Sequence, residues 1–200
     1  MSRNLRISAA CLARIELDDK LLVGLNKRRL EAGRRVYTPF GGALEFYDSA
    51  RLFLDSLDAD YEKGNDLRFR ISADRWGEFE EWFDRREDRE TSPYRELREE
   101  FVDEEGVFPE MPGEAYSLDG LVTVKPKREA TDRPGQEGVM TQRIFEVHNV
   151  LFVPDYETMI KSALAKDNTR LALVTQEEIR SGQTLGGIEV ASNCSPLIYE

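Results

Sequence analysis

The segment from Ser92 to Gly106 limits how this chain folds more than any other stretch, because it is bounded like a helix and carries two different faces. Ser92-Pro93 is typical of a helix start, and Gly106 is typical of a helix end. At α-helical spacing, Leu97 and Phe101 fall on one side. The carboxylates that share another side are those of Glu96, Glu99, Glu100 and Asp103. We therefore predict a helix with an acidic stripe.

The rest of the sequence alternates between strand-like and helix-like patterns. Alternating apolar residues predict strands over 6–17, 20–25, 36–42, 67–71, 116–125, 143–153 and 170–174, of which the first two form a hairpin and the third ends at a glycine pair. Helical spacing predicts helices over 48–57, 76–83 and 154–165. Thr175–Glu178 fits a capping box that opens a last helix, and the polar stretch 126–138 is expected to be a mobile loop. The order predicts a mixed α/β fold.

Helical spacing also places Trp76, Phe79, Trp82 and Phe83 on one face of their helix. These rings could stack on a base, but aromatic residues at this spacing are more often core residues. We expect them to lie in the core.

Length and charge narrow the classes of function. The 200 residues suit one domain, 1–200, and the absence of a run of about 18 apolar residues predicts a cytoplasmic protein with no membrane partner. A net charge of −11 argues against binding to long nucleic acid, whose phosphates attract an excess of basic residues. Cys11, Cys194 and the single histidine His148 do not have the spacing of a zinc site.

The acidic stripe has two interpretations. Most glutamate-rich helices are simply solvated, and the stripe alone does not exclude this. Mg²⁺, however, prefers oxygen ligands and takes a few carboxylates while substrate phosphates complete its coordination shell. Glutamates at positions i, i+3 and i+4 of a helix supply such a partial shell, which favours metal-assisted chemistry on a phosphorylated substrate.

Two motifs resemble those of the Nudix hydrolases. Arg95–Glu100 (RELREE) matches the central six positions of the Nudix box, and Pro39–Glu45 (PFGGALE) resembles the glycine turn that precedes it. With five residues between it and Gly42, Asp48 stands where the family has glutamate. The gap to Arg95, seven residues in the family, is here 46 residues long, so the box is split by an insertion over 49–94. A split box is similar to that of the Nudix domains associated with nucleotide second-messenger synthases of the SMODS type.

The motif fits the sequence in two registers. The first uses Arg95, Glu96, Glu99 and Glu100, although the glycine expected soon after Glu100 comes only at Gly106. The second takes the metal ligands as Glu100, Asp103 and Glu104, but it places glutamate where the family has arginine. We prefer the first because it retains the arginine, and Glu100 is a ligand in both.

The resemblance implies a Nudix-like α/β/α sandwich with a mixed sheet, and Mg²⁺ or Mn²⁺ bound by Glu96, Glu99 and Glu100. It gives Arg95 the role of orienting these carboxylates and makes the Gly42 carbonyl a further ligand. The implied activity is hydrolysis of a diphosphate (pyrophosphate) linkage in a nucleoside diphosphate-linked or related nucleotide. The alternative, favoured by the altered spacing, is a catalytically degenerate domain that senses a nucleotide or binds a partner. A homodimer is compatible with either.

Two further groups are candidates for substrate binding. Basic residues cluster before the glycine turn, and Arg28 and Arg35 among them are expected to meet substrate phosphates, although a solvated hairpin end is an equal alternative. Glu146 is a candidate substrate contact, ligand or general base, and it shares a strand face with His148. A surface or core-edge position is the alternative for both residues.

Overall fold

The computed structural model describes residues 4–131 and 136–198, which divide into two compact units. Within the described residues, unit 1 comprises 4–11, 42–92, 123–131 and 136–146, and unit 2 comprises 12–41, 93–122 and 147–198. Nearly all of the insertion expected over 49–94 therefore belongs to unit 1. No helix of the described segments combines the length and the apolar character needed to cross a membrane.

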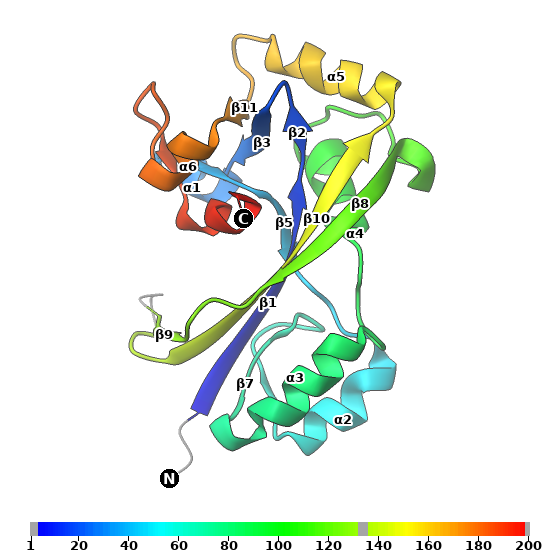
Figure 1. The fold of residues 1–200 in the computed structure, drawn as a ribbon, viewed down its shortest axis with the longest axis vertical. Coiled ribbons are helices and arrows are strands. Elements are labelled where there is room, and N and C mark those ends of the chain that lie inside the picture. The colour runs from blue at the N-terminus through cyan, green and yellow to red at the C-terminus, as the bar shows by residue number, and fades with distance from the viewer. Residues whose placement is uncertain (1–3, 132–135, 199–200) are drawn as a thin grey trace. The chain divides into compact units, whose positions relative to one another are not determined.

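Unit 1 is built on antiparallel strands with helices packed beside them (Figure 1). In it β7 pairs with β6 and with the first part of β1, and β9 pairs with the first part of β10. The strands are β1 (Asn4–Arg14), β6 (Asp60–Tyr61), β7 (Arg68–Ser72), β9 (Glu129–Ala130) and β10 (Met140–Phe152). The helices are α2 (Arg51–Ser56) and α3 (Trp76–Arg85), preceded by the 3-10 turns Asp48–Ala50 and Ala73–Arg75.

An aromatic cluster forms the core of unit 1. Phe79, Trp82 and Phe83 are almost fully buried on one face of α3, and the Phe53 ring of α2 stacks on Trp82 with centroids 5.6 Å apart. The helix at 76–83 and its place in the core are thus confirmed. The strand at 67–71 and the helix at 48–57 are confirmed as well.

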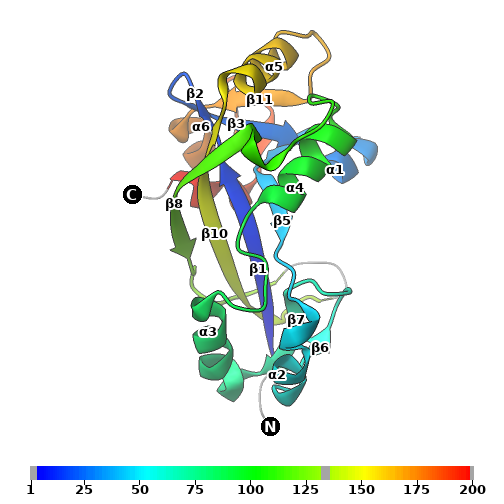
Figure 2. The same cartoon turned by 90° about the vertical axis from the view of Figure 1, so that its right-hand side faces the viewer.

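Unit 2 contains a second sheet with the strand order β11-β3-β4-β12, in which only β4 and β12 are parallel; β2 also pairs with β3. Figure 2 shows α5 beside β11. The strands are β2 (Glu16–Leu17), β3 (Lys20–Leu25), β4 (Val36–Thr38), β5 (Phe40–Ala43), β8 (Tyr116–Val124), β11 (Leu171–Val174) and β12 (Glu189–Val190), of which β5 and β8 run into unit 1. The helices are α1 (Lys27–Glu31), α4 (Tyr94–Arg98), α5 (Pro154–Leu164) and α6 (Gln176–Ser181), with 3-10 turns at Gly113–Ala115 and Ser192–Ile198.

Local sequence signals explain two of the turns in unit 2. β2 and β3 form the predicted hairpin, and both residues of its turn, Asp18 and Asp19, have positive φ (51° and 59°), as a two-residue type I′ turn requires. Thr175 and Glu178 form the predicted capping box at the start of α6. With two sheets and several helices, the chain has the expected mixed α/β fold class.

Two local expectations are wrong, and a third is refined. The glycine pair does not end a strand, because Gly41 and Gly42 lie inside β5. The stretch 126–138 is not wholly loop, since it contains β9, and its residues 132–135 lie outside the described part. The N-cap position of α4 is Pro93, the second residue of the predicted Ser92-Pro93 helix start.

Candidate functional site

Unit 2 contains a cavity of about 440 Å³ whose wall is rich in carboxylates. Five glutamates line it from α4 and the helical turn that follows: Glu96, Glu99, Glu100, Glu104 and Glu105. The structure therefore brings together the three predicted metal ligands and adds two neighbours. The first residues of α1, the end of β4 and Asn193 complete most of the wall.

A change of helix type decides which carboxylates reach this cavity. After α4 the chain continues as a π-helix over Glu99–Glu104, where the Glu105 N–H donates to the Glu100 carbonyl (2.8 Å), five residues back. The wider turn rotates later residues away from their α-helical positions. Asp103 consequently does not line the cavity and lies near Arg98 instead (3.9 Å), so its predicted place on the common acidic face is wrong. Leu97 and Phe101 are fully buried on the other side, as predicted.

Glu100 is the cavity carboxylate that is hydrogen-bonded to the glycine turn. Its Oε2 accepts a hydrogen bond from the Gly41 N–H (2.9 Å), which ties the π-helix to β5. Burial raises the pKa of Glu100 well above its usual value, and the charges of Glu96, Glu104 and Glu105 raise it further, against the lowering effect of the Gly41 hydrogen bond. A positive charge beside this group would therefore stabilise its ionised form.

Arg95 contacts the two other predicted ligands. Its guanidinium lies 2.7 Å from Glu96 and 3.5 Å from Glu99, and these carboxylates are 16% and 50% exposed. Such a contact fixes side-chain direction more than it stabilises the fold, since exposed ion pairs contribute about 0–1 kcal/mol. The position agrees with the expected orienting role.

The two additional carboxylates have cationic neighbours of their own. The Lys27 ammonium is 4.0 Å from Glu104, and the Arg170 guanidinium, just before β11, forms a close ion pair with Glu105. The positive charges of Lys27 and Arg170 thus partly balance the negative charges of Glu104 and Glu105.

The residues of the basic cluster differ in whether they line the cavity. Arg28 and Arg29 line the cavity, whereas Arg35 does not. Arg29 and Arg34 share Glu189 as an ionic partner, at 3.3 and 2.9 Å. Arg28 has no ion-pair partner in the described segments, so its guanidinium is the cavity cation most open to a ligand.

The carboxylate wall fits a hard divalent cation by its chemistry, because its carboxylates offer oxygen ligands and because burial, together with the neighbouring negative charges, raises the pKa of Glu100. Across 4–131 and 136–198, however, no three acidic, histidine or cysteine side chains converge closely enough to hold an ion as they stand. Side-chain rotation about the helix would have to complete a ligand set. Gly42 belongs to unit 1, and its role as a ligand stays a prediction.

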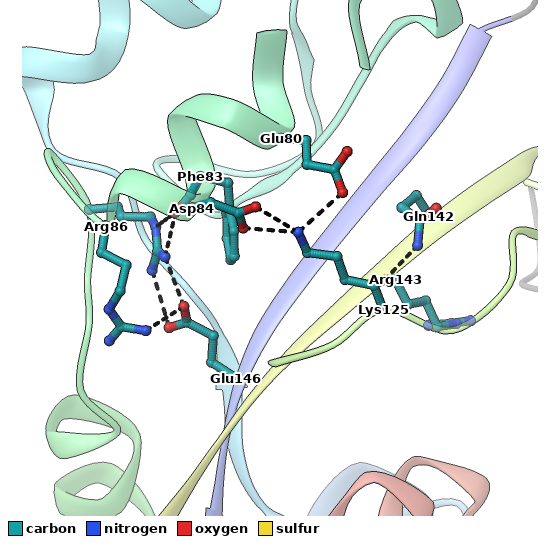
Figure 3. A network of polar contacts seen from close by, with 9 residues as sticks. Glu80, Phe83, Asp84, Arg86, Lys125, Gln142, Arg143 and Glu146 are labelled. Atoms are coloured by element: carbon teal, nitrogen blue, oxygen red, sulfur yellow. Dashed lines mark hydrogen bonds and ion pairs between the residues drawn. The ribbon is translucent and has the colours of Figure 1, made fainter. Parts of the chain in front are cut away.

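Glu146 lies in unit 1 within a buried ionic cluster (Figure 3). Its carboxylate is 1% exposed and accepts hydrogen bonds from Arg86 (2.6 Å) and Arg89 (2.8 and 3.2 Å). Arg89 is itself fully buried and also donates to the Phe83 carbonyl. These contacts hold the end of α3 to β10. His148 is buried too, in unit 2, and neither residue lines the carboxylate cavity.

The sequence did not point to several residues of the cavity wall. Glu105 was missed because its position in the wall depends on the π-helix. Asn193 lines the cavity although it is far from the other wall residues in the sequence, and no local sequence pattern predicts such a position. Only the dense charge of 27–35 and 95–105 gave a signal that these segments meet.

A family model described as the SMODS-associated NUDIX domain matches residues 4–196, almost the whole chain. No curated protein matches, and no solved structure does.

Proposed function

Because the chain belongs to the SMODS-associated Nudix family, we propose that the carboxylate cavity of unit 2 hydrolyses the diphosphate linkage of a nucleotide-like substrate with Mg²⁺ or Mn²⁺. The observation that carries this proposal is the composition of the cavity wall, where five glutamates face Lys27, Arg28 and Arg29. Carboxylates suit the cation, and guanidinium groups suit the phosphates.

Each part of the wall has a distinct task in this proposal. Glu96, Glu99 and Glu100 hold the divalent ion, which when bound neutralises phosphate oxygens and activates water for attack on phosphorus. Arg95 keeps Glu96 and Glu99 directed at the same region, as its two contacts suggest. Arg28 binds a phosphate oxygen of the substrate, and one of the remaining carboxylates accepts the proton of the attacking water.

The second candidate function is nucleotide sensing without turnover. It is favoured by the absence of a converged ligand set in the described residues and by the engagement of Glu100 with the Gly41 N–H. In that case the cavity binds a nucleotide through its cationic residues and the glutamates only balance charge.

Turnover assays separate the two functions. The purified chain is incubated with dinucleotides, sugar nucleotides and nucleoside triphosphates in Mg²⁺ or Mn²⁺, and release of nucleoside monophosphate or phosphate is measured. Glu100→Gln should lower kcat/KM by about 100-fold or more, because even outer-shell partners of metal ligands contribute 10- to 100-fold. Asp103→Asn is the matched control on the same helical segment and should stay near wild-type activity, since Asp103 does not line the cavity.

Two results would contradict the hydrolase. Equal losses in Glu100→Gln and Asp103→Asn would mean that the helix is needed only for folding. Ligand-induced thermal stabilisation with no product from any substrate would instead support the sensor.

A further inference from the structure

We propose that Thr38 and Asn193 form a neutral hydrogen-bonding part of the wall of the carboxylate cavity and recognise the uncharged nucleoside portion of the ligand. This inference rests on the proposed function in taking the ligand to be a nucleotide, but it does not require turnover. Thr38 and Asn193 lie 155 positions apart in the sequence.

Parallel pairing of β4 and β12 brings these two residues together. Tyr37 is opposite Val190 in the ladder, and the Ala191 N–H donates to the Tyr37 carbonyl (2.9 Å). The next residue of β4 is Thr38, and Asn193 follows two residues after Ala191. Both line the cavity.

Asn193 is exposed but stands on a fixed backbone. Ala191 and Cys194 on either side of it are buried, and the Cys194 N–H donates to the Ala191 carbonyl (2.9 Å). The backbone at Asn193 is therefore already ordered, and only the rotamer of its side chain has to be fixed when a ligand binds.

Neither side chain uses its hydrogen-bonding groups within the described part of the protein. Within 4–131 and 136–198, no hydrogen bond joins the Thr38 hydroxyl or the Asn193 amide to another group. The other asparagine of the wall, Asn26, differs because its Oδ1 caps α1 by accepting from the Arg29 N–H (3.1 Å). Thr38 and Asn193 are therefore available for a ligand.

The chemistry of these two groups differs from that of the remaining wall. Ionised carboxylates only accept hydrogen bonds and cationic groups only donate them, whereas a hydroxyl and an amide do both. Nucleobase edges and sugar hydroxyls present both donors and acceptors. Neutral groups in the wall of a charged cavity thus suit the part of a nucleotide that carries no charge.

Binding of the four nucleoside 5′-monophosphates and their 2′-deoxy forms to the full chain tests the inference without turnover. Calorimetry in Mg²⁺ gives Kd for wild type, Thr38→Val, Asn193→Ala and the double variant. Ser192→Ala is the control, an exposed neighbour that does not line the cavity. We expect each single variant to weaken the preferred nucleotide by about 2- to 12-fold, the range of one hydrogen bond, and to flatten the preference among ligands.

The pattern of loss identifies the group that is recognised. A flattened preference among bases means base recognition, and a smaller difference between ribo and deoxy forms means sugar recognition. Equal Kd values in wild type and Asn193→Ala, a uniform loss for all ligands, or no nucleotide binding to wild type would overturn the inference. If the variants flatten the preference among nucleotides but the chain hydrolyses no substrate, the inference stands and only the proposed hydrolase activity is contradicted.

Discussion

Replacing Glu146 by Gln should destabilise the protein strongly, because the change removes the charge that balances two arginines. Arg89 is fully buried and Glu146 is 1% exposed, so neither the guanidinium nor its partner is solvated by water. The Glu146 carboxylate accepts three hydrogen bonds from Arg86 and Arg89, at 2.6, 2.8 and 3.2 Å. A glutamine has one oxygen, and its amide group would place donors against donors.

The magnitude follows from this burial. Removing one partner of a buried ion pair typically costs about 3–5 kcal/mol, because a charge is left without compensation. The backbone carbonyl of Phe83, which also accepts from Arg89, retains part of the interaction, so we expect a loss near 3 kcal/mol in the free energy of unfolding. That is a large share of the roughly 5–15 kcal/mol that stabilises a typical domain.

Urea denaturation followed by circular dichroism measures this loss, with Glu129→Gln as the matched control. Glu129 pairs with Arg143 at 3.2 Å, but it is 63% exposed, so its substitution should cost below about 1 kcal/mol. At a slope of about 2 kcal/mol per molar urea, the two midpoints should fall by about 1.5 M and less than about 0.5 M. Equal midpoints for the two variants would refute the assignment of Glu146 to a structural ionic cluster.

The other predictions concern the cavity. Because the folded-state pKa of Glu100 is raised, its protonated form stabilises the fold fully below the ordinary glutamate pKa, and this stability is lost as pH rises through the raised value. In metal-free buffer, melting temperature should therefore fall over that range in wild type but less in Glu100→Gln; parallel curves would contradict the raised pKa. Gly24→Ala should cost about 1–3 kcal/mol in urea, because the added Cβ would lie 3.3 Å from the Phe40 ring. Gly113→Ala, which meets nothing within 4 Å, should cost little, and similar losses would mean that the contact is relieved freely.

Elements whose signals are local were predictable from the sequence. The Asp18-Asp19 turn and the Thr175 capping box each lie within a few residues, and α3 shows its apolar face directly. Boundaries that depend on pairing partners were not, which is why the glycine pair was placed at the end of a strand instead of inside β5. β9 was missed for the same reason, since two residues become a strand only beside β10.

Site residues followed the same division between local and distant information. The acidic and basic segments were visible as charge, and the structure places Glu96, Glu99, Glu100 and Arg28 on one cavity. Strand alternation predicts that Glu146 and His148 share a face, but it does not predict what covers that face. Its cover is Arg89, whose position depends on the left-handed Arg86 that ends α3.

The π-helix changes how the two motif registers relate to each other. A regular α-helix would place Glu96, Glu99, Glu100 and Asp103 on one stripe, so Glu100, Asp103 and Glu104 would compete with the first set as a shifted alternative. In the π-helix each N–H donates to the carbonyl five residues back, and of the second register Glu104 lines the cavity whereas Asp103 does not. The spacing of the family's motif alone therefore does not predict which of these carboxylates line the cavity. Comparing Mn²⁺ affinity in Glu99→Gln and Glu104→Gln would separate the registers, since the carboxylate that binds the ion should lower affinity when neutralised and the other should not.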